Sequence, residues 1–342
     1  MSTEINTLVI QIPCYNEAQT LGKTIADLPK SLPGVGRIII LVIDDGSKDG
    51  TAQVALSSGA DYVVRHRRNR GLAQAFMTGL NTALTLGADV IINTDADNQY
   101  PGRYISDLVA PILSKQADLV IGDRQPGKNV HFSPIKRLLE VMGSWVIRQL
   151  SQTDASDAPS GFRAYSRYAA LRVQVYNEYS YTLETLIQGG RDRLAIVHVP
   201  IETNAPTRPS RLHKGILNFI WRQSGTIMRS YVLYQPLKSF SLLGGPFLLV
   251  GAFLLLRFVY YYLIGASGIA RYVQSVSIGG TLFIFGFLLI FMGLLGDAIR
   301  ANRMMLAEIL VRLRENSTLN EATLSEINGC PLLAKEDYAS EN

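Results

Sequence analysis

Cysteine is scarce in this sequence of 342 residues, which holds only Cys14 and Cys330. The two lie near opposite ends of the chain, without the spacing of a metal site or the number that a disulfide framework needs. A reducing compartment is therefore expected. We also expect no signal peptide, because the first apolar run, 7-TLVIQIP-13, is short and no basic segment precedes it.

Charge is also scarce, since charged residues make up 18% of the chain and hydrophobic residues 47%. A typical soluble domain has roughly 25% charged residues, so part of this chain is expected to avoid water. The net charge of +5 suits an acidic partner, such as a phosphate, a nucleic acid or anionic lipid headgroups, without choosing among them.

Two long uncharged runs lie near the C-terminus, Ser239–Leu256 with 18 residues and Tyr272–Gly296 with 25. About 20 apolar residues in a helix cross a bilayer, so we predict two transmembrane helices within 239–298. The first transmembrane helix can continue past Arg257 only if the Arg257 side chain faces a polar partner or reaches the membrane surface. Basic residues flank the pair on both outer sides, which places both termini in the cytoplasm. A buried helical hairpin of a soluble protein is the alternative.

The segment 211–238 mixes large apolar residues with Lys and Arg at helical spacing. Amphipathic helices in a membrane interface have this pattern, because their basic residues meet anionic headgroups. A basic helix packed on its own domain is the alternative.

The first 125 residues alternate short β-branched runs with segments of helical spacing. The expected strands are 7–13, 37–43, 61–66, 88–94 and 117–123, and the expected helices are 17–28, 50–57, 72–86 and 104–113. This alternation predicts an α/β domain with a mostly parallel sheet, which binds ligands at the carboxyl ends of its strands. The basic cluster 65-RHRRNRG-71 can balance phosphate charge or form a solvated surface.

Two acids, Asp95 and Asp97, follow the fourth expected strand in the motif 95-DADNQ-99. Both carboxylates can turn toward one hard divalent cation, and Gln99 can add an amide oxygen. A D-x-D motif alone is more often a solvated turn, but its place at a strand end beside other polar loops favours a site for a metal-bound diphosphate.

A second acidic motif, 44-DDGSKDGT-51, follows the second expected strand. Asp44 and Asp45 could form another metal pair, but the residues after them are typical of a turn that caps a helix, with Asp49 or Ser47 as the cap. We assign Asp44 to nucleoside recognition and Asp45 to structure.

Several motifs, in order along the chain, resemble glycosyltransferase family 2. They are 12-IPCYNE-17, 44-DDGSKDGT-51, 69-NRGLAQA-75, 94-TDADNQYP-101, 122-GDR-124 and 157-DAPSGFR-163. With two C-terminal spans, the chain resembles the polyprenyl-phosphate branch, which includes dolichol-phosphate mannose synthases and bacterial undecaprenyl-phosphate glucosyltransferases. The resemblance covers residues 5–310 and implies a GT-A fold, a Rossmann-like and mostly parallel sheet, in a cytoplasmic domain followed by interfacial helices and two transmembrane helices.

The resemblance also implies a nucleotide-sugar donor held with Mg²⁺ or Mn²⁺. The implied contacts are Pro13, Tyr15, Glu17 and Asp44 with the base and ribose; Asp95, Ala96, Asp97 and Gln99 with the metal-bound diphosphate; and Arg124 and Arg211 with sugar or phosphate. The chain departs from the common N-x-G-x-G pattern at residues 70–73, so no backbone contact is assigned to that loop.

A polyprenyl phosphate acceptor already carries an anionic oxygen, so it needs positioning and charge neutralisation more than a strong base. We expect an inverting, in-line displacement in which Arg163 holds the lipid phosphate and Asp97 acts through the metal. Asp157 is the candidate base or acceptor-orienting residue, because the family that this chain resembles carries an acid just before S-G-F-R. The alternative is that Asp157 only caps the loop near Pro159. The chain lacks the Q-x-x-R-W motif of processive synthases, which favours a single transfer.

The expected function is transfer of glucose from UDP-glucose to undecaprenyl phosphate at the cytoplasmic membrane face. The alternatives are GDP-mannose as the donor, a different lipid acceptor, or a nucleotide-binding membrane scaffold without activity. The expected parts are 1–125 for the nucleotide sugar, 126–210 for the acceptor, 211–238 for the interface, 239–298 for the membrane and 299–342 as a cytoplasmic tail. Paired glycines in the spans could support a homo-oligomer, and no nucleic-acid partner is expected.

Overall fold

The computed structural model describes residues 5–125, 157–175, 181–205, 232, 235–265, 273–317, 326–327 and 330–334. The chain divides into two compact units. Residues 1–210 together with 310–342 form one, here called the α/β unit, and residues 211–309 form the other, here called the helical unit. Arg211 and almost all of the expected interfacial segment lie outside the described residues.

The α/β unit is built on one sheet, whose described strands have the order β7-β5-β6-β4-β1-β2-β3-β9-β8. The strands are β1 Ile5–Cys14, β2 Val35–Asp44, β3 Tyr62–Arg65, β4 Val90–Asn93, β5 Leu119–Asp123, β6 Arg163–Ser166, β7 Ile196–Pro200, β8 Glu326–Ile327 and β9 Cys330–Ala334. β1 pairs in parallel with β2 and β4, and β2 with β3, whereas β6 lies antiparallel between β4 and β5. The carboxyl ends of β1, β2, β4 and β5 therefore meet the start of β6 at one edge.

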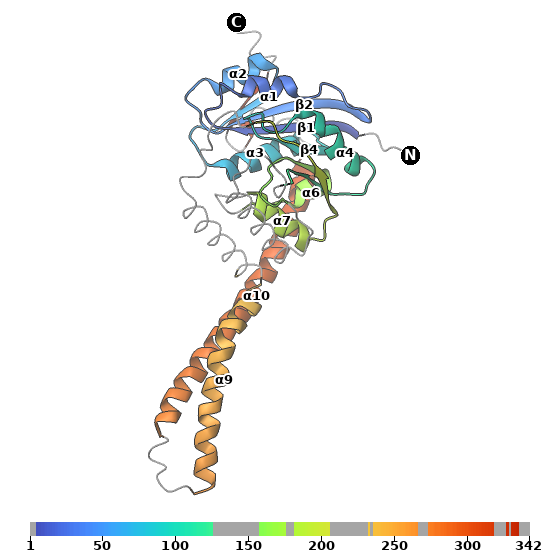
Figure 1. Ribbon diagram of the computed structural model, residues 1–342. Helices are drawn as coiled ribbons and strands as arrows, with labels where there is room; N and C mark the ends of the chain where they lie inside the picture. Colours follow the sequence, from blue (N-terminus) through green and yellow to red (C-terminus); the bar gives the residue numbers. More distant parts are fainter. Residues whose placement is uncertain are drawn as a thin grey trace. The chain divides into compact units, whose positions relative to one another are not determined.

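Helices cover both faces of this sheet (Figure 1). They are α1 Leu21–Asp27, α2 Thr51–Ser58, α3 Leu72–Thr85, α4 Ile105–Leu113 after the short 3₁₀ turn Gly102–Tyr104, α6 Arg167–Arg172 and α7 Tyr181–Arg191. The predicted α/β architecture with a mostly parallel sheet is confirmed.

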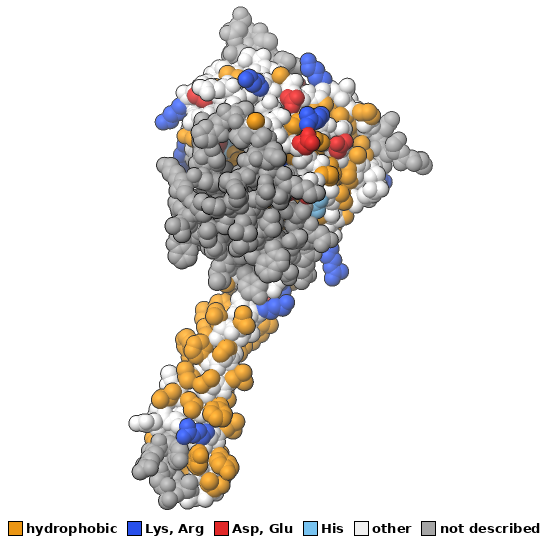
Figure 2. All heavy atoms as spheres, in the orientation of Figure 1, with side chains coloured by type: hydrophobic (Ala, Val, Ile, Leu, Met, Phe, Trp, Pro, Cys, Tyr) orange, Lys and Arg blue, Asp and Glu red, His pale blue; other side chains and the backbone are white. Residues whose placement is uncertain are grey.

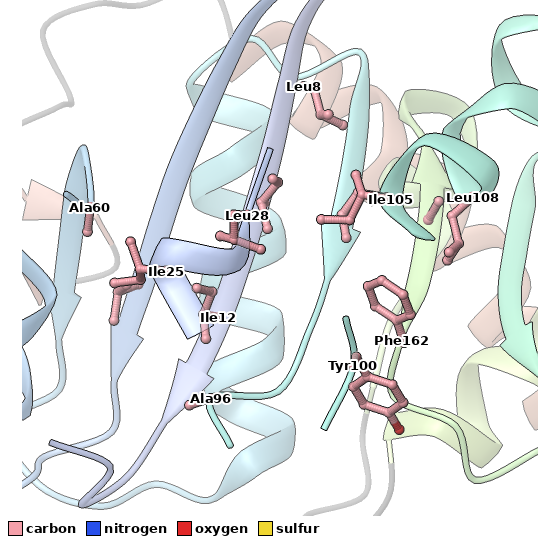
Figure 3. Packing of buried hydrophobic residues seen from close by; sticks show 14 of the residues in the cluster. Leu8, Ile12, Ile25, Leu28, Ala60, Ala96, Tyr100, Ile105, Leu108 and Phe162 are labelled. Carbon is pink, nitrogen blue, oxygen red and sulfur yellow. The ribbon is translucent and has the colours of Figure 1, made fainter. Parts of the chain in front are cut away.

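The core explains why β1 is apolar along nearly its whole length. Successive side chains of a strand point to opposite faces, and here both faces are covered. Leu8 and Ile12 pack in a cluster that includes Ile25 of α1 and Leu108 of α4, as Figure 3 shows. On the opposite face, a Cβ on Gly79 of α3 would come within 2.5 Å of the side-chain oxygen of Gln11, so glycine permits the close crossing of α3.

Some elements differ from the sequence prediction. α1 begins at Leu21 rather than residue 17, because Asn16 adopts φ +53° and the backbone turns before the helix. β6, β7, β8 and β9 were not predicted. The sequences of β6 and β9 contain no β-branched residue, the signal that marked the predicted strands. β9 pairs with β3 where we expected a separate tail.

The helical unit contains α9, Pro236–Leu263, and most of α10, Val273–Ser317. Both helices are long and apolar enough to cross a membrane, and only 11% and 17% of their most apolar stretches are buried. Figure 2 shows hydrophobic side chains over their surface. Such exposure suits lipid and not water, so the structure favours two membrane spans over a buried hairpin.

Candidate active site

The first part of the sheet edge is formed by the ends of β1 and β2. Asp44, the last residue of β2, is fully buried and accepts a hydrogen bond from the Ser47 amide at 2.8 Å. Its other carboxylate oxygen lies 3.2 Å from Nε of Arg65. Asp44 is thus a fixed anion at the position expected for nucleoside recognition, and Pro13 pairs with Ile43 beside it.

The loop after β1 is tied to the turn after β2. The Asn16 amide donates to Oγ of Ser47 at 2.9 Å, and the Glu17 amide donates to Oγ1 of Thr51 at 3.0 Å. Glu17 is buried, whereas Tyr15 is 40% exposed. These contacts bring together the loops that carry the expected base and ribose contacts.

Asp45 has the structural role assigned to it from the sequence. Its carboxylate lies 2.6 Å from Nδ1 of buried His66 and accepts hydrogen bonds from the amides of Arg70 and Gly71 at 2.8 and 2.9 Å. It therefore fixes the loop that follows β3. The expected cap of α2 is shifted by one residue: Gly50 occupies the N-cap position, and the carboxylate of Asp49 before it accepts from the backbone amide of Thr51 at 3.2 Å.

The loop after β4 carries Asp95, Ala96, Asp97 and Gln99 at the same edge. The Gln99 amide and side-chain nitrogen donate to the two oxygens of Asp97 at 3.2 and 2.9 Å. The Ala96 carbonyl accepts from Thr24 of α1 at 2.9 Å, and Ala96 is buried. Two partly buried carboxylates and an adjacent amide are oxygen ligands of the kind that Mg²⁺ and Mn²⁺ prefer.

No group of three or more His, Cys, Asp or Glu side chains with metal-site geometry occurs among the described residues. Asp95 and Asp97 provide two carboxylates in the loop after β4, and a cation held by two protein carboxylates can take its other ligands from water and substrate phosphates. The segment after β7 braces this loop, since Asn204 donates to the carbonyls of Gln99 and Asn98 at 2.9 and 2.8 Å.

The sequence analysis missed Asn93 and Tyr181, two polar residues that lie close to Asp95 and Gly161. The side-chain nitrogen of Asn93 donates to the Gly161 carbonyl at 2.8 Å and lies 3.0 Å from the Tyr181 hydroxyl. A Cβ on Gly161 would lie 3.2 Å from Asp95 Oδ1, so glycine lets the carboxylate approach the backbone. The sequence did contain a signal for Asn93, because this polar residue ends the apolar run 88–93.

Tyr100 and Tyr181 keep their protons at this site. Burial raises the pKa of Tyr100 to about 12 and that of Tyr181 well above its ordinary value, and the negative charge of Asp95 adds to both increases. Both phenol oxygens accept a hydrogen bond here, that of Tyr100 from the Gly161 amide at 3.3 Å and that of Tyr181 from the Asn93 side chain at 3.0 Å. Figure 3 shows the Tyr100 ring against Phe162, with ring centroids 5.1 Å apart.

Asp157 is bound by Arg124 across the ends of β5 and β6. One carboxylate oxygen accepts from the amide and Nε of Arg124 at 2.9 and 2.7 Å, and the other accepts from Nη2 at 2.7 Å. Asp157 is fully buried, and the Arg124 side chain is 12% exposed. The loop that begins at Asp157 contacts the segment after Asp95, since the Gly161 amide donates to the Tyr100 hydroxyl at 3.3 Å.

Arg163 does not fit the direct phosphate contact expected from the sequence. Its side chain is fully buried, with Nε donating to the Ser160 carbonyl at 2.8 Å and Nη2 to the Ala158 carbonyl at 2.7 Å. Nη1 donates to Oγ1 of Thr185 at 2.5 Å. We correct its role accordingly, because a guanidinium committed to loop carbonyls inside the protein holds the 157–163 loop instead.

Comparison with known proteins adds an independent line of evidence. The sequence profile described as Glycosyl transferase family 2 matches residues 9–186. The chain is 29% identical over 216 residues to the UDP-N-acetylglucosamine–dolichyl-phosphate N-acetylglucosaminyltransferase of Methanococcus voltae, covering 56% of this chain and 83% of that protein. It is 30% identical over 200 residues to the undecaprenyl-phosphate mannosyltransferase of Micrococcus luteus, covering 56% and 80%.

Among solved structures, the chain is similar to glucosyl-3-phosphoglycerate synthase from Mycobacterium tuberculosis, crystallised with Mn²⁺, UDP-glucose and phosphoglyceric acid. The TM-score is 0.51 at 22% identity, and the match covers 66% of this chain and 79% of that one. This likeness concerns the fold, and together with the observed strand pairing it confirms the expected GT-A architecture.

Proposed function

The chain belongs to glycosyltransferase family 2, and from this premise we propose that it transfers one sugar from a nucleotide sugar to a polyprenyl phosphate at a membrane surface. One observation carries the proposal. Asp44, Asp95, Asp97 and the Asp157–Arg124 pair gather at one sheet edge in a chain that also has two helices of membrane-spanning length. Both relatives named above act on polyprenyl phosphates by their names, which supports the acceptor class.

The donor would lie along the edge from β2 to β4. Asp44 is placed for the nucleoside, with Tyr15 exposed nearby on the loop that is tied to the turn after β2. Asp95, Asp97 and Gln99 would hold Mg²⁺ or Mn²⁺ with the donor diphosphate. When bound, such a cation stabilises the negative charge of the departing nucleoside diphosphate. Arg211, which lies outside the described residues, remains a proposed phosphate contact.

The reaction would be an in-line displacement with inversion. An acceptor phosphate oxygen forms a bond to the anomeric carbon while the bond from that carbon to the diphosphate oxygen breaks, and the nucleoside diphosphate leaves with the electron pair. No proton has to be removed from an acceptor that is already anionic. We therefore assign Asp157 to orienting Arg124, whose guanidinium would neutralise phosphate charge at the reacting centre.

We propose glucose as the sugar to test first, because the two C-terminal spans resemble those of the glucosyltransferase branch. The names of the two relatives instead specify N-acetylglucosamine and mannose, so those donors form the comparison set.

The topology would place the α/β unit and both termini in the cytoplasm. Residues 310–342 cluster with residues 1–210, which supports two crossings by α9 and α10 between them. Gly245 and Gly280 leave open space beside α9 and α10, so a second copy could pack there as a homo-oligomer.

Transfer by the purified full-length protein tests the proposed function. We expect labelled glucose from UDP-glucose to enter an organic-extractable, mild-acid-labile lipid when undecaprenyl phosphate and Mn²⁺ or Mg²⁺ are present, and EDTA to abolish the product. GDP-mannose and UDP-N-acetylglucosamine are run in parallel. Asp95→Asn and Asp97→Asn should each lower the rate at least about 100-fold, since both remove a carboxylate from the cation.

Asp107→Asn is the matched control, because Asp107 is an exposed acid on α4. Its rate should stay within about twofold of the wild type, as for a typical surface substitution. A labelled product without the polyprenyl phosphate would assign another acceptor. Nucleotide binding without transfer from any of the three donors would favour a nucleotide-binding scaffold.

A further inference from the structure

The C-terminal end of the described chain has no part in the reaction proposed above, yet it folds into the α/β unit. β9 pairs antiparallel with β3, with Leu332, Leu333 and Ala334 opposite Val64, Val63 and Tyr62. This segment lies outside the range matched by the family profile, residues 9–186.

A second contact fixes the same part of the chain. Nη1 of Arg314, near the end of α10, donates to the carbonyls of Leu171 and Val173 at 3.0 and 3.1 Å. These carbonyls belong to the last turn and the C-cap of α6, where a cation is favoured by the unpaired carbonyls and the helix dipole. The end of α10 thus contacts α6, and the strand β9 that follows it pairs with β3.

β3 carries the contacts that hold the nucleoside end of the site. Its last residue, Arg65, places Nε 3.2 Å from Asp44 and donates from Nη2 to the Ser47 carbonyl at 3.0 Å. The next residue, His66, donates its amide to the Asp44 carbonyl at 2.9 Å, and its ring lies 2.6 Å from Asp45. A shift of β3 would therefore move the groups around Asp44 and loosen the loop that Asp45 fixes.

β3 alone is a weak support for these contacts. It has four residues and pairs with β2 on one side. Without β9 its other side would be an open edge, and short edge strands exchange and fray more readily than paired ones. β9 supplies the missing partner.

We propose that β9 is a positioning strand for the donor site, which strengthens nucleotide binding by holding β3, and with it Arg65 and His66, against Asp44 and Asp45. The proposal rests on the proposed function in one respect, the binding of the nucleoside at Asp44. Because coupling between two equilibria is reciprocal, bound nucleotide must in turn stabilise the pairing of β9 with β3.

Hydrogen exchange on the full-length wild-type protein tests this coupling without any substitution. UDP and GDP, each with Mn²⁺, are the probes, and binding is measured in the same samples by calorimetry. We expect the nucleotide that binds to slow amide exchange in residues 330–334 at least threefold. Binding with unchanged exchange there would overturn the proposal, whereas absence of binding by either nucleotide would count against the proposed function instead.

Two substitutions on opposite faces of β9 provide the second test. Leu332 is partly buried, while Leu333 is 39% exposed. Leu332→Asp should raise the Kd of the nucleotide at least fivefold and leave kcat at saturating donor within twofold, and the matched control Leu333→Thr should keep the wild-type Kd within twofold. If the aspartate variant does not fold, Leu332→Ala, expected to raise Kd about fourfold, replaces it, with Leu333→Ala as its control. Equal Kd values in the folded Leu332 variant and the control would overturn the proposal.

Discussion

At the scale of single residues, the Asp157 carboxylate is already occupied. Both of its oxygens accept hydrogen bonds from Arg124, and the side chain is fully buried. A general base must reach the proton that it removes, directly or through one water. We therefore propose a positioning role for Asp157, in which its carboxylate fixes the Arg124 guanidinium.

This role predicts that Asp157 and Arg124 act as a unit. Asp157→Asn and Arg124→Lys should each lower kcat/KM by about 10- to 100-fold, because a displacement of a charged group by about 1 Å can lower the rate by that much. The double variant should lose little more than either single one, since each change breaks the same pair. Steady-state kinetics of the three variants measures this.

The pH profile separates the two roles of Asp157. A positioning role leaves the shape of the kcat/KM profile the same in Asp157→Asn and Arg124→Lys. Loss of an acidic limb in Asp157→Asn alone, with the limb retained in Arg124→Lys, would identify Asp157 as the base.

At the scale of elements, glycines set the distance between α9 and α10. A Cβ on Gly286 would lie 2.5 Å from the Leu248 amide nitrogen and 2.7 Å from the Gly244 carbonyl. A Cβ on Gly251 would lie 2.7 Å from the Gly279 carbonyl. Small residues allow such backbone approach between membrane helices, where packing supplies much of the association energy.

Gly286→Leu should therefore destabilise the contact between α9 and α10 within one chain. Gly280→Leu should leave that contact intact, since no atom of the described residues lies within 4 Å of a Cβ on Gly280. Overpacking a close contact costs about 1–3 kcal/mol. Thermal unfolding of the two variants in the same detergent measures the difference. Equal midpoints would show that the two helices do not meet at Gly286, and a lower midpoint for Gly280→Leu would indicate a partner on that face.

At the scale of the whole molecule, the return of the chain into the α/β unit constrains its topology. The segments before and after the helical unit belong to one folded unit, so the proposed topology puts both on one side of the membrane. It puts the end of α9 at Leu263 on the other side.

Labelling of single introduced cysteines tests this topology. In a background with Cys14→Ser and Cys330→Ser, we expect Lys115→Cys to react with an impermeant maleimide only in inside-out vesicles, and Gly265→Cys only in right-side-out vesicles. Lys115 is exposed on the α/β unit, and Gly265 follows α9. Labelling of both positions from the same side would contradict two membrane crossings.

Local chemistry in the sequence determined much of this protein. Short β-branched runs predicted β1 to β5, the uncharged runs predicted α9 and α10, and acids directly after a buried strand predicted the Asp95 loop. These signals are local, because side-chain alternation, helix length and turn preference depend on neighbouring residues.

Only the tertiary structure decided the partners of residues that lie far apart in the chain. Strand order and register determine three such contacts. They are the pairing of Asp157 with Arg124, the burial of Arg163 against the carbonyls of the 157–163 loop, and the pairing of β9 with β3. Strands of four or five residues leave that order unspecified locally, because their pairing is selected by the packing of the complete sheet. The sequence therefore specified which polar residues follow the strands. The fold decided which of these side chains stay accessible and which, like Arg163, are buried and hold a loop.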